Sequence, residues 1–186
     1  MANSNINKVK THFLRTFEKG ISSAYPYLPK HVLEVEKWAN KLLKIYPKAN
    51  KEILLLSVWL HDIGQAIGDK NDDHAIKSEK ETLSFLSKLK LKPEKIEKVA
   101  HCVRAHRCRD IQPETLEEKL LAVADSASHM TDINYIVHLS DWPKKLVFEK
   151  LERDYRDVGI FPKLKKEIAP LYKAWKRLMK VYPDKI

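Results

Sequence analysis

The sequence predicts an all-α protein. Apolar residues recur at the spacing of one helical face in segment after segment, as in Ile6, Val9 and Phe13. Only 4 of the 186 residues are glycine, and short runs of alternating apolar and polar residues are few. Because β sandwiches and barrels need many such runs, both observations favour helices over strands.

Prolines and one polar loop divide the first half of the chain into four predicted helices. The second of these ends at Tyr46, because the residue before a proline avoids the helical region. The third is apolar nearly all round, which is typical of a helix buried at the centre of a bundle. The predicted ranges are 6–17, 30–46, 51–63 and 73–89, with a loop over 64–73. On the fourth helix we expect four residues to face inward: Ala75, Ile76, Leu83 and Leu86.

The second half continues the helical pattern. Pro93 suits the first turn of a fifth helix, and Pro113 is expected to open a sixth. Two or three further helices fill the ranges 132–139, 143–156 and 162–181. No internal repeat or low-complexity linker interrupts the chain. We therefore expect one domain over residues 1–186, with a motif-bearing core of about 28–140 and a helical extension over 141–186.

Composition indicates the cellular setting. The only two cysteines, Cys102 and Cys108, are too few for a disulfide framework. The segment from Met1 to Lys10 is polar and has no apolar run of signal-peptide length. No stretch approaches 18 uninterrupted apolar residues, so no membrane span is expected. We predict a cytoplasmic protein with no membrane partner.

The chain is basic, with a formal net charge of +10. Residues 144–186 contain 13 Lys and Arg against 6 Asp and Glu, so 13 − 6 = +7 lies in this last quarter. Such a field attracts phosphates, nucleotides and nucleic acid. The alternative is a lysine-rich solvated helix surface without a binding role.

Four polar residues lie where a helical bundle needs apolar ones. His31 shares a helical face with Val35, and His61 shares one with Val58. Asp62 follows His61 directly, and Asp125 comes one turn after an apolar run. A buried carboxylate needs a hydrogen-bond partner or a cation. Two imidazoles and two carboxylates from three helices could hold one divalent metal; the alternative is a buried polar network without metal.

The chain resembles the HD phosphohydrolase superfamily. The resemblance depends on His31, on the doublet His61-Asp62 continued by Ile63-Gly64, and on Asp125 within Val123-Ala124-Asp125-Ser126. It covers residues 28–140. It implies an all-α fold that binds a divalent metal through His31, His61, Asp62 and Asp125. Most members cleave phosphoester or phosphoanhydride bonds, often in nucleotides.

These residue types suit metal-assisted hydrolysis. A divalent ion lowers the pKa of bound water and polarises a phosphoryl oxygen. Imidazole combined with carboxylate favours Mn, Fe, Co, Ni or Zn, and favours Mg less because of the two nitrogens. We expect one or two ions, with the Asp62 carboxylate also orienting the attacking water.

The remaining histidines divide into three groups. Some HD families bind a second metal through two histidines in the regions of His74 and His106, so either of these could be a metal ligand or a phosphate contact; a capping or supporting role is the alternative. His101 is expected to be exposed, and His129 either braces Asp125 or lies on the surface. Two histidines have no supporting neighbours in the sequence: His12 and His138.

Arginines near His106 are the candidate phosphate contacts. Guanidinium groups suit bidentate recognition of phosphate. Arg107 follows His106 directly and is our first choice for steadying the charge that develops on phosphorus during the reaction. The other nearby cations are expected to be solvated: Lys77, Lys80, Arg104 and Arg109.

The chain departs from several named HD subfamilies. Gln65-Ala66-Ile67-Gly68 stands where alarmone hydrolases usually carry Glu-Asp, so that activity is disfavoured. The Gly-Tyr-Pro motif of cyclic-dinucleotide phosphodiesterases is absent from the sequence. Many sequences with His-Asp-Ile-Gly have Lys next, and Gln65 lacks its positive charge, so the sequence gives little reason to expect a phosphate contact at that position.

Three functions follow as hypotheses. The first is a hydrolase that removes phosphate or pyrophosphate from a nucleotide-like or other small phosphorylated substrate. The second is a non-catalytic metal-containing module that binds a nucleotide or nucleic acid through its basic surface. The third is a purely structural helical partner protein. The oligomeric state stays open, with Trp142 or Trp175 as candidate interface residues.

Overall fold

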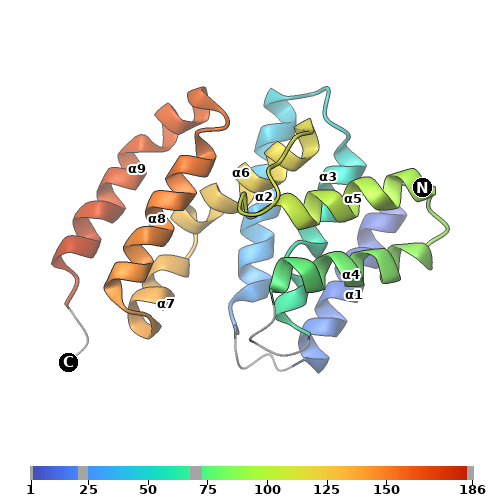
Figure 1. Ribbon diagram of the computed structural model, residues 1–186, viewed down its shortest axis with the longest axis horizontal. Coiled ribbons are helices and arrows are strands. Elements are labelled where there is room, and N and C mark those ends of the chain that lie inside the picture. The colour runs from blue at the N-terminus through green and yellow to red at the C-terminus, as the bar shows by residue number, and fades with distance from the viewer. Residues whose placement is uncertain (1, 21–24, 68–72, 184–186) are drawn as a thin grey trace.

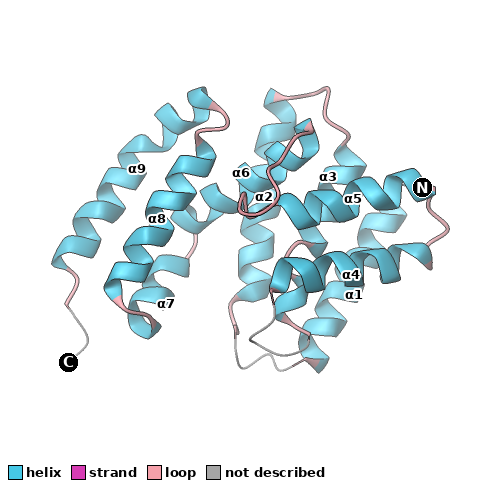
Figure 2. Cartoon of the chain, in the orientation of Figure 1, coloured by secondary structure: helices cyan, strands magenta, loops and turns pink. Residues whose placement is uncertain are grey.

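The protein is built from helices. The computed structural model describes residues 2–20, 25–67 and 73–183, and these ranges contain helices and loops but no strand (Figure 2). This confirms the predicted all-α class. The elements are α1 (Ala2–Lys19), α2 (Leu28–Ile45), α3 (Lys51–Leu60), the 3-10 turn η2 (Ile63–Gln65), α4 (His74–Ser87), α5 (Pro93–Ala105), α6 (Leu116–Thr131), α7 (Asn134–Asp141), α8 (Lys144–Val158) and α9 (Pro162–Val181).

Two helices form the centre of the fold. All residues of α3 from Ile53 to Leu60 are buried, which confirms the central position predicted from its all-round apolar pattern. Helix α6 is buried along most of its length and contacts α2, α3, α5 and α8. The polar residues at the end of α3 and in the middle of α6 therefore lie in the interior.

Local sequence signals explain where these central helices begin. The Asn50 side chain accepts a hydrogen bond from the backbone N–H of Ile53 and caps α3. Thr115 and Glu118 form a reciprocal capping box at the start of α6. Pro113 was expected to open this helix but lies in the preceding loop, because the capping box places the first turn at Leu116.

The last helices stand at one end of the molecule. Figure 1 shows α8 and α9 side by side, with α6 between them and the helices of the N-terminal half. Their buried residues, such as Leu151 and Ile168, belong to the same hydrophobic core as α1 to α6. Trp175 of α9 donates a hydrogen bond to the carbonyl oxygen of Met130 on α6 (2.9 Å). The chain therefore forms a single all-α domain, while the predicted limits of its core and extension stay a prediction.

The predicted inward face of α4 was partly wrong. Ile76 and Leu83 are 38% and 41% exposed. The buried stripe contains instead Ala75, two hydroxyl residues and Leu86. One of the hydroxyls, Ser78, accepts a hydrogen bond from the backbone N–H of Gly64 (2.8 Å). The helix is thus oriented by polar contacts beside the His-Asp turn, and the apolar pattern alone did not reveal them.

Two other expectations concern segments outside the helices. The predicted loop over 64–73 begins within η2, and its residues 68–72 lie outside the described part of the chain. Among the described residues, no helix is long and apolar enough to cross a bilayer.

Because α3 lies at the centre of the fold, truncating one of its leucines should destabilise the protein more than truncating an exposed leucine elsewhere. Leu54 is fully buried, so Leu54→Ala should lower the free energy of unfolding by about 2–5 kcal/mol. Leu33 on α2 is 47% exposed, and Leu33→Ala should cost about 0.5 kcal/mol or less. Urea unfolding of both variants measures the difference; equal losses would contradict the burial of α3.

Candidate metal centre

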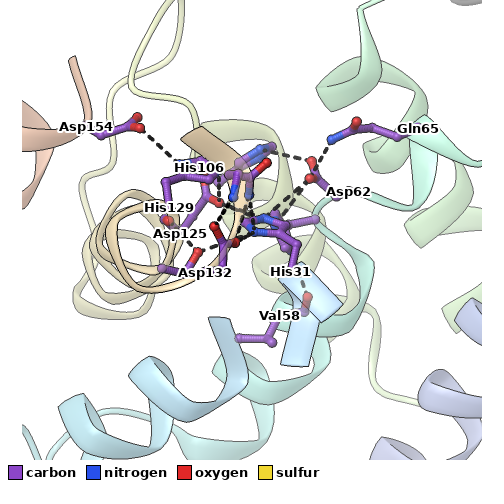
Figure 3. A network of polar contacts seen from close by, with 12 residues as sticks. His31, Val58, Asp62, Gln65, His106, Asp125, His129, Asp132 and Asp154 are labelled. Atoms are coloured by element: carbon purple, nitrogen blue, oxygen red, sulfur yellow. Dashed lines mark hydrogen bonds and ion pairs between the residues drawn. The ribbon is translucent and has the colours of Figure 1, made fainter. Parts of the chain in front are cut away.

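The four predicted metal ligands converge at one point. His31 lies in the first turns of α2, His61 and Asp62 follow α3, and Asp125 projects from α6 (Figure 3). The Asp125 Oδ1 atom lies 3.1 Å from His31 Nε2 and 3.7 Å from His61 Nε2. Both Nε2 atoms lie 3.7 Å from Asp62 Oδ2. Since all four residues are buried, these side chains face one another rather than solvent.

The two ligand histidines are held in one orientation by their other ring nitrogen. His61 is the C-cap of α3, and its Nδ1 lies 2.7 Å from the carbonyl oxygen of Val58 in the last turn. His31 Nδ1 lies 3.2 Å from Asp132 Oδ2. A carbonyl or ionised carboxylate oxygen can only accept, so in each ring Nδ1 carries a proton and Nε2 is directed toward the carboxylates of the centre.

Atoms without hydrogen-bond partners mark the same point. Within the described residues, the buried atoms that lack a partner include His31 Nε2, His61 Nε2 and Asp62 Oδ1. Buried polar atoms are rarely left unsatisfied. Two imidazole nitrogens and carboxylate oxygens are also a donor set that suits a divalent transition metal. The residues present therefore fit such an ion.

A second group of ligand atoms shares Asp62. Its Oδ1 lies 3.3 Å from His74 Nε2 and 3.6 Å from His106 Nε2. His106 is the C-cap of α5 and repeats the arrangement of His61, with Nδ1 2.6 Å from the carbonyl oxygen of Val103. Burial, and then the neighbouring His61, lower the pKa of His106 to about 3, so the ring stays neutral. Asp62 thus turns one oxygen to each group, the geometry in which a carboxylate bridges two ions.

The centre carries strong negative potential. Burial alone would lower the pKa of His31, but Asp125 and Asp132 raise it to about 10. Burial would likewise raise the pKa of Asp62, but the surrounding histidines hold it below its usual range. The carboxylates therefore stay ionised and attract positive charge, which a divalent cation supplies without protonating the histidines.

Sequence reasoning missed the residues that support the ligands on the side of α7. The Asp132 carboxylate accepts hydrogen bonds from the backbone and side chain of Asn134 (2.7 and 2.8 Å) while it orients His31. Asn134 in turn accepts a hydrogen bond from the hydroxyl of Tyr25. No spacing pattern signals this role, because Asp132 and Asn134 lie at a helix boundary where polar residues are common.

A further buried group lies on the side of α8. His129 is buried, stacks on the His31 ring at 4.9 Å and lies 3.5 Å from Asp125, so the bracing role that we considered is the one the geometry supports. Its Nδ1 lies 3.1 Å from Asp154 Oδ2, and Asp154 also pairs with Lys150 (3.2 Å). These contacts connect the extension directly to the metal centre (Figure 3).

The remaining predicted residues have definite partners. Gln65 stands where many sequences with the His-Asp-Ile-Gly motif have lysine. Its side-chain amide donates a hydrogen bond to Asp62 Oδ2 (2.5 Å). The Arg107 guanidinium lies near the centre but pairs with Asp73 (2.6 Å). His101 is exposed as expected and pairs with Glu118. His12 stacks on Phe85, and His138, which had no recognisable neighbours in the sequence, is buried against Trp142.

The metal centre opens into a large cavity. Its volume is about 1140 Å³, and Asp62, His74, His106 and Asp125 lie on its floor. Segments from both halves of the chain line its walls, from Tyr25 before α2 to Arg153 on α8. Such a volume accommodates a small organic ligand together with water.

A helical bundle with this buried His/Asp cluster has the features of a metal-dependent hydrolase domain. The family model described as HD domain matches residues 30–130, more than half of the chain, and the protein belongs to this family. HD-domain proteins are generally metal-dependent phosphohydrolases. No curated protein and no solved structure matches the chain.

The contact between Asp132 and His31 predicts an effect on metal affinity. Asp132→Asn removes the negative charge that holds the Nδ1 proton, so the affinity for Mn or Zn should fall about 10- to 100-fold. Competition against a chelating dye measures the dissociation constant. Asp110→Asn is the matched control, because Asp110 is exposed and pairs with Arg104 outside the cavity lining. Equal metal affinities of the two variants would show that Asp132 does not support the metal centre.

Proposed function

We propose that the protein is a metal-dependent phosphohydrolase that cleaves a phosphoester or phosphoanhydride bond in a nucleotide-like substrate. The observation that carries the proposal is a cluster of histidine and aspartate side chains beside an open cavity, whose lining includes Asp62, His74, His106 and Asp125. Within the cluster, the buried atoms that lack a hydrogen-bond partner include His31 Nε2, His61 Nε2 and Asp62 Oδ1, whereas a purely structural buried network would satisfy such atoms. The opening of the cluster into a space that a ligand can enter supports catalysis.

The residues divide between holding a metal and positioning the substrate. His31, His61, Asp62 and Asp125 would hold a divalent ion, which would lower the pKa of a water molecule and polarise a phosphoryl oxygen. His74 and His106 would hold a second ion or contact the phosphate. Gln65 would fix the Asp62 carboxylate through its hydrogen bond. Arg107 would steady negative charge on the phosphoryl group, with Asp73 holding its guanidinium in place.

An aromatic wall supports a nucleotide-like substrate. Tyr25, His138 and Trp142 all line the cavity. The His138 ring stacks on Trp142 with ring centroids 3.9 Å apart, and the Tyr25 ring centroid lies 6.4 Å from that of His138, with the two ring planes inclined by 30°. Tyr25 is also close to the metal centre, because its hydroxyl donates to Asn134 beside Asp132. The wall therefore leads outward from the metal centre to Trp142, which is 40% exposed and on which a base can stack.

Removal of the bridging carboxylate tests the proposed function. Asp62→Ala should reduce bound transition metal from near-stoichiometric to near zero, because this side chain belongs to two of the three groups of candidate ligand atoms found among the described residues. Hydrolysis of nucleotides should fall by about three orders of magnitude or more. Elemental analysis and a hydrolysis screen with added Mn measure the two effects on one preparation.

The matched control is Asp110→Ala, which should keep both metal and activity. Chelation of the wild-type protein should abolish activity, and Mn should restore it. Full metal content and full activity in Asp62→Ala would overturn the proposed mechanism. Stoichiometric metal without hydrolysis of any phosphoester would favour the non-catalytic binding module.

The aromatic wall predicts a change in substrate preference. Trp142→Ala should raise KM for a nucleoside monophosphate by about 5- to 100-fold, because a stacked base contributes about 1–3 kcal/mol. KM for ribose 5-phosphate, which has no base, should rise much less. Trp142→Phe keeps an aromatic face and should recover most of the affinity. Equal increases for both substrates would place the base elsewhere.

Nucleic-acid binding through the basic C-terminal segment stays a prediction. Exposed cations on α9 include Lys163, Lys166 and Arg177. Other cations of this region are already paired with acids, as in Lys176 with Glu152. The structure thus favours a solvated basic helix surface beside the proposed hydrolase site.

A further inference from the structure

The cavity contains cations with and without partners. Arg107 pairs with Asp73, and Lys150 pairs with Asp154. Arg109 and Arg153 also line the cavity, but neither guanidinium group forms an ion pair or hydrogen bond within residues 2–20, 25–67 and 73–183. The two unpaired arginines come from different elements, the turn after α5 and the helix α8. Arg109 is exposed, as the sequence-based expectation of a solvated side chain predicted, but it also lines the cavity.

The backbone after α5 explains why neighbouring arginines both reach the cavity. Cys108 has a φ of 49°, in the left-handed region that glycine adopts most readily. Its side chain is buried, and its backbone N–H donates to the carbonyl oxygen of Ala105. With Cys108 anchored inward, Arg107 and Arg109 on either side of it line the cavity.

Arg109 and Arg153 are close enough to repel each other. Burial lowers the pKa of Arg109, and the positive charges of Arg107 and Arg153 lower it further, while Asp73 and Asp110 offset part of this effect. The acids near Arg153 do not relieve this repulsion, because Asp154 is held by Lys150 and His129, and Asp157 by Arg156. An anion between the two guanidinium groups would relieve it.

We propose that Arg109 and Arg153 form a subsite for a second phosphoryl group of the substrate, separate from the group held at the metal centre. The substrate class is then a nucleoside di- or triphosphate, or another compound with at least two phosphate groups. This inference rests on the proposed phosphohydrolase function. It goes beyond the family match, because Arg153 lies outside residues 30–130.

The binding of inorganic tripolyphosphate and inorganic phosphate tests the subsite directly. The variant is Arg109→Gln combined with Arg153→Gln, and calorimetry on the full chain measures both dissociation constants. Wild type should bind tripolyphosphate more tightly than phosphate. The double variant should lose about tenfold or more of its tripolyphosphate affinity, and much less of its phosphate affinity, since two charge-assisted contacts are removed.

Arg177→Gln is the matched control, because Arg177 is exposed on α9 and does not line the cavity. It should bind tripolyphosphate like wild type. Equal losses in Arg177→Gln and the double variant would overturn the inference, because they would show attraction by net charge alone. A loss that is equal for phosphate and tripolyphosphate would also overturn it.

Turnover separates this inference from the proposed function. In the double variant, KM for a nucleoside triphosphate should rise at least tenfold more than KM for the monophosphate. Hydrolysis of nucleotides without this difference would overturn the subsite and leave the hydrolase intact. Arginine-dependent tripolyphosphate binding without hydrolysis of any phosphoester would overturn the hydrolase, and with it the assignment of the bound anion as a substrate group.

Discussion

The burial of Asp62 and Asp125 is the constraint on which the rest of the structure depends. Two carboxylates in the interior of a helical bundle cost free energy unless positive charge or hydrogen-bond donors compensate them. Here the compensation comes from the histidines that surround the two carboxylates, of which His31, His61 and His106 are almost fully buried. Apolar side chains would fill this part of the core at a lower cost in free energy. The presence of these charged residues in the core therefore indicates a function rather than a contribution to stability.

The ends of helices deliver the histidines to this point. The last carbonyl groups of an α-helix lack intrahelical partners, and His61 and His106 each return to one of them through Nδ1. One local contact therefore satisfies a carbonyl oxygen, fixes the tautomer and directs Nε2 toward Asp62. His31 has no such carbonyl, since it lies near the beginning of α2, and takes Asp132 instead.

The sequence predicted the helices, and the convergence of four candidate ligands, where the signal was local. The helices follow from apolar periodicity and prolines, and the four candidate ligands follow from an ordered set of His and Asp on apolar faces. The predicted inward orientation of Ile76 and Leu83 was wrong, because Ser78 and its contact with Gly64 orient α4. The roles of Asp132 and Asp154 were missed, because they arise only when α7 and α8 pack against α6.

The C-terminal extension is therefore part of the site. Asp154 reaches the metal centre through His129, while Lys150 and Arg153 from the same helix line the cavity. Lys150, Arg153 and Asp154 lie outside the part of the chain that matches the HD family. The division has a physical basis in the proposed function: the matched residues 30–130 contain the candidate metal ligands, whereas the extension contributes charges that would contact a particular substrate. Chemistry and specificity would then come from different segments that share one hydrophobic core.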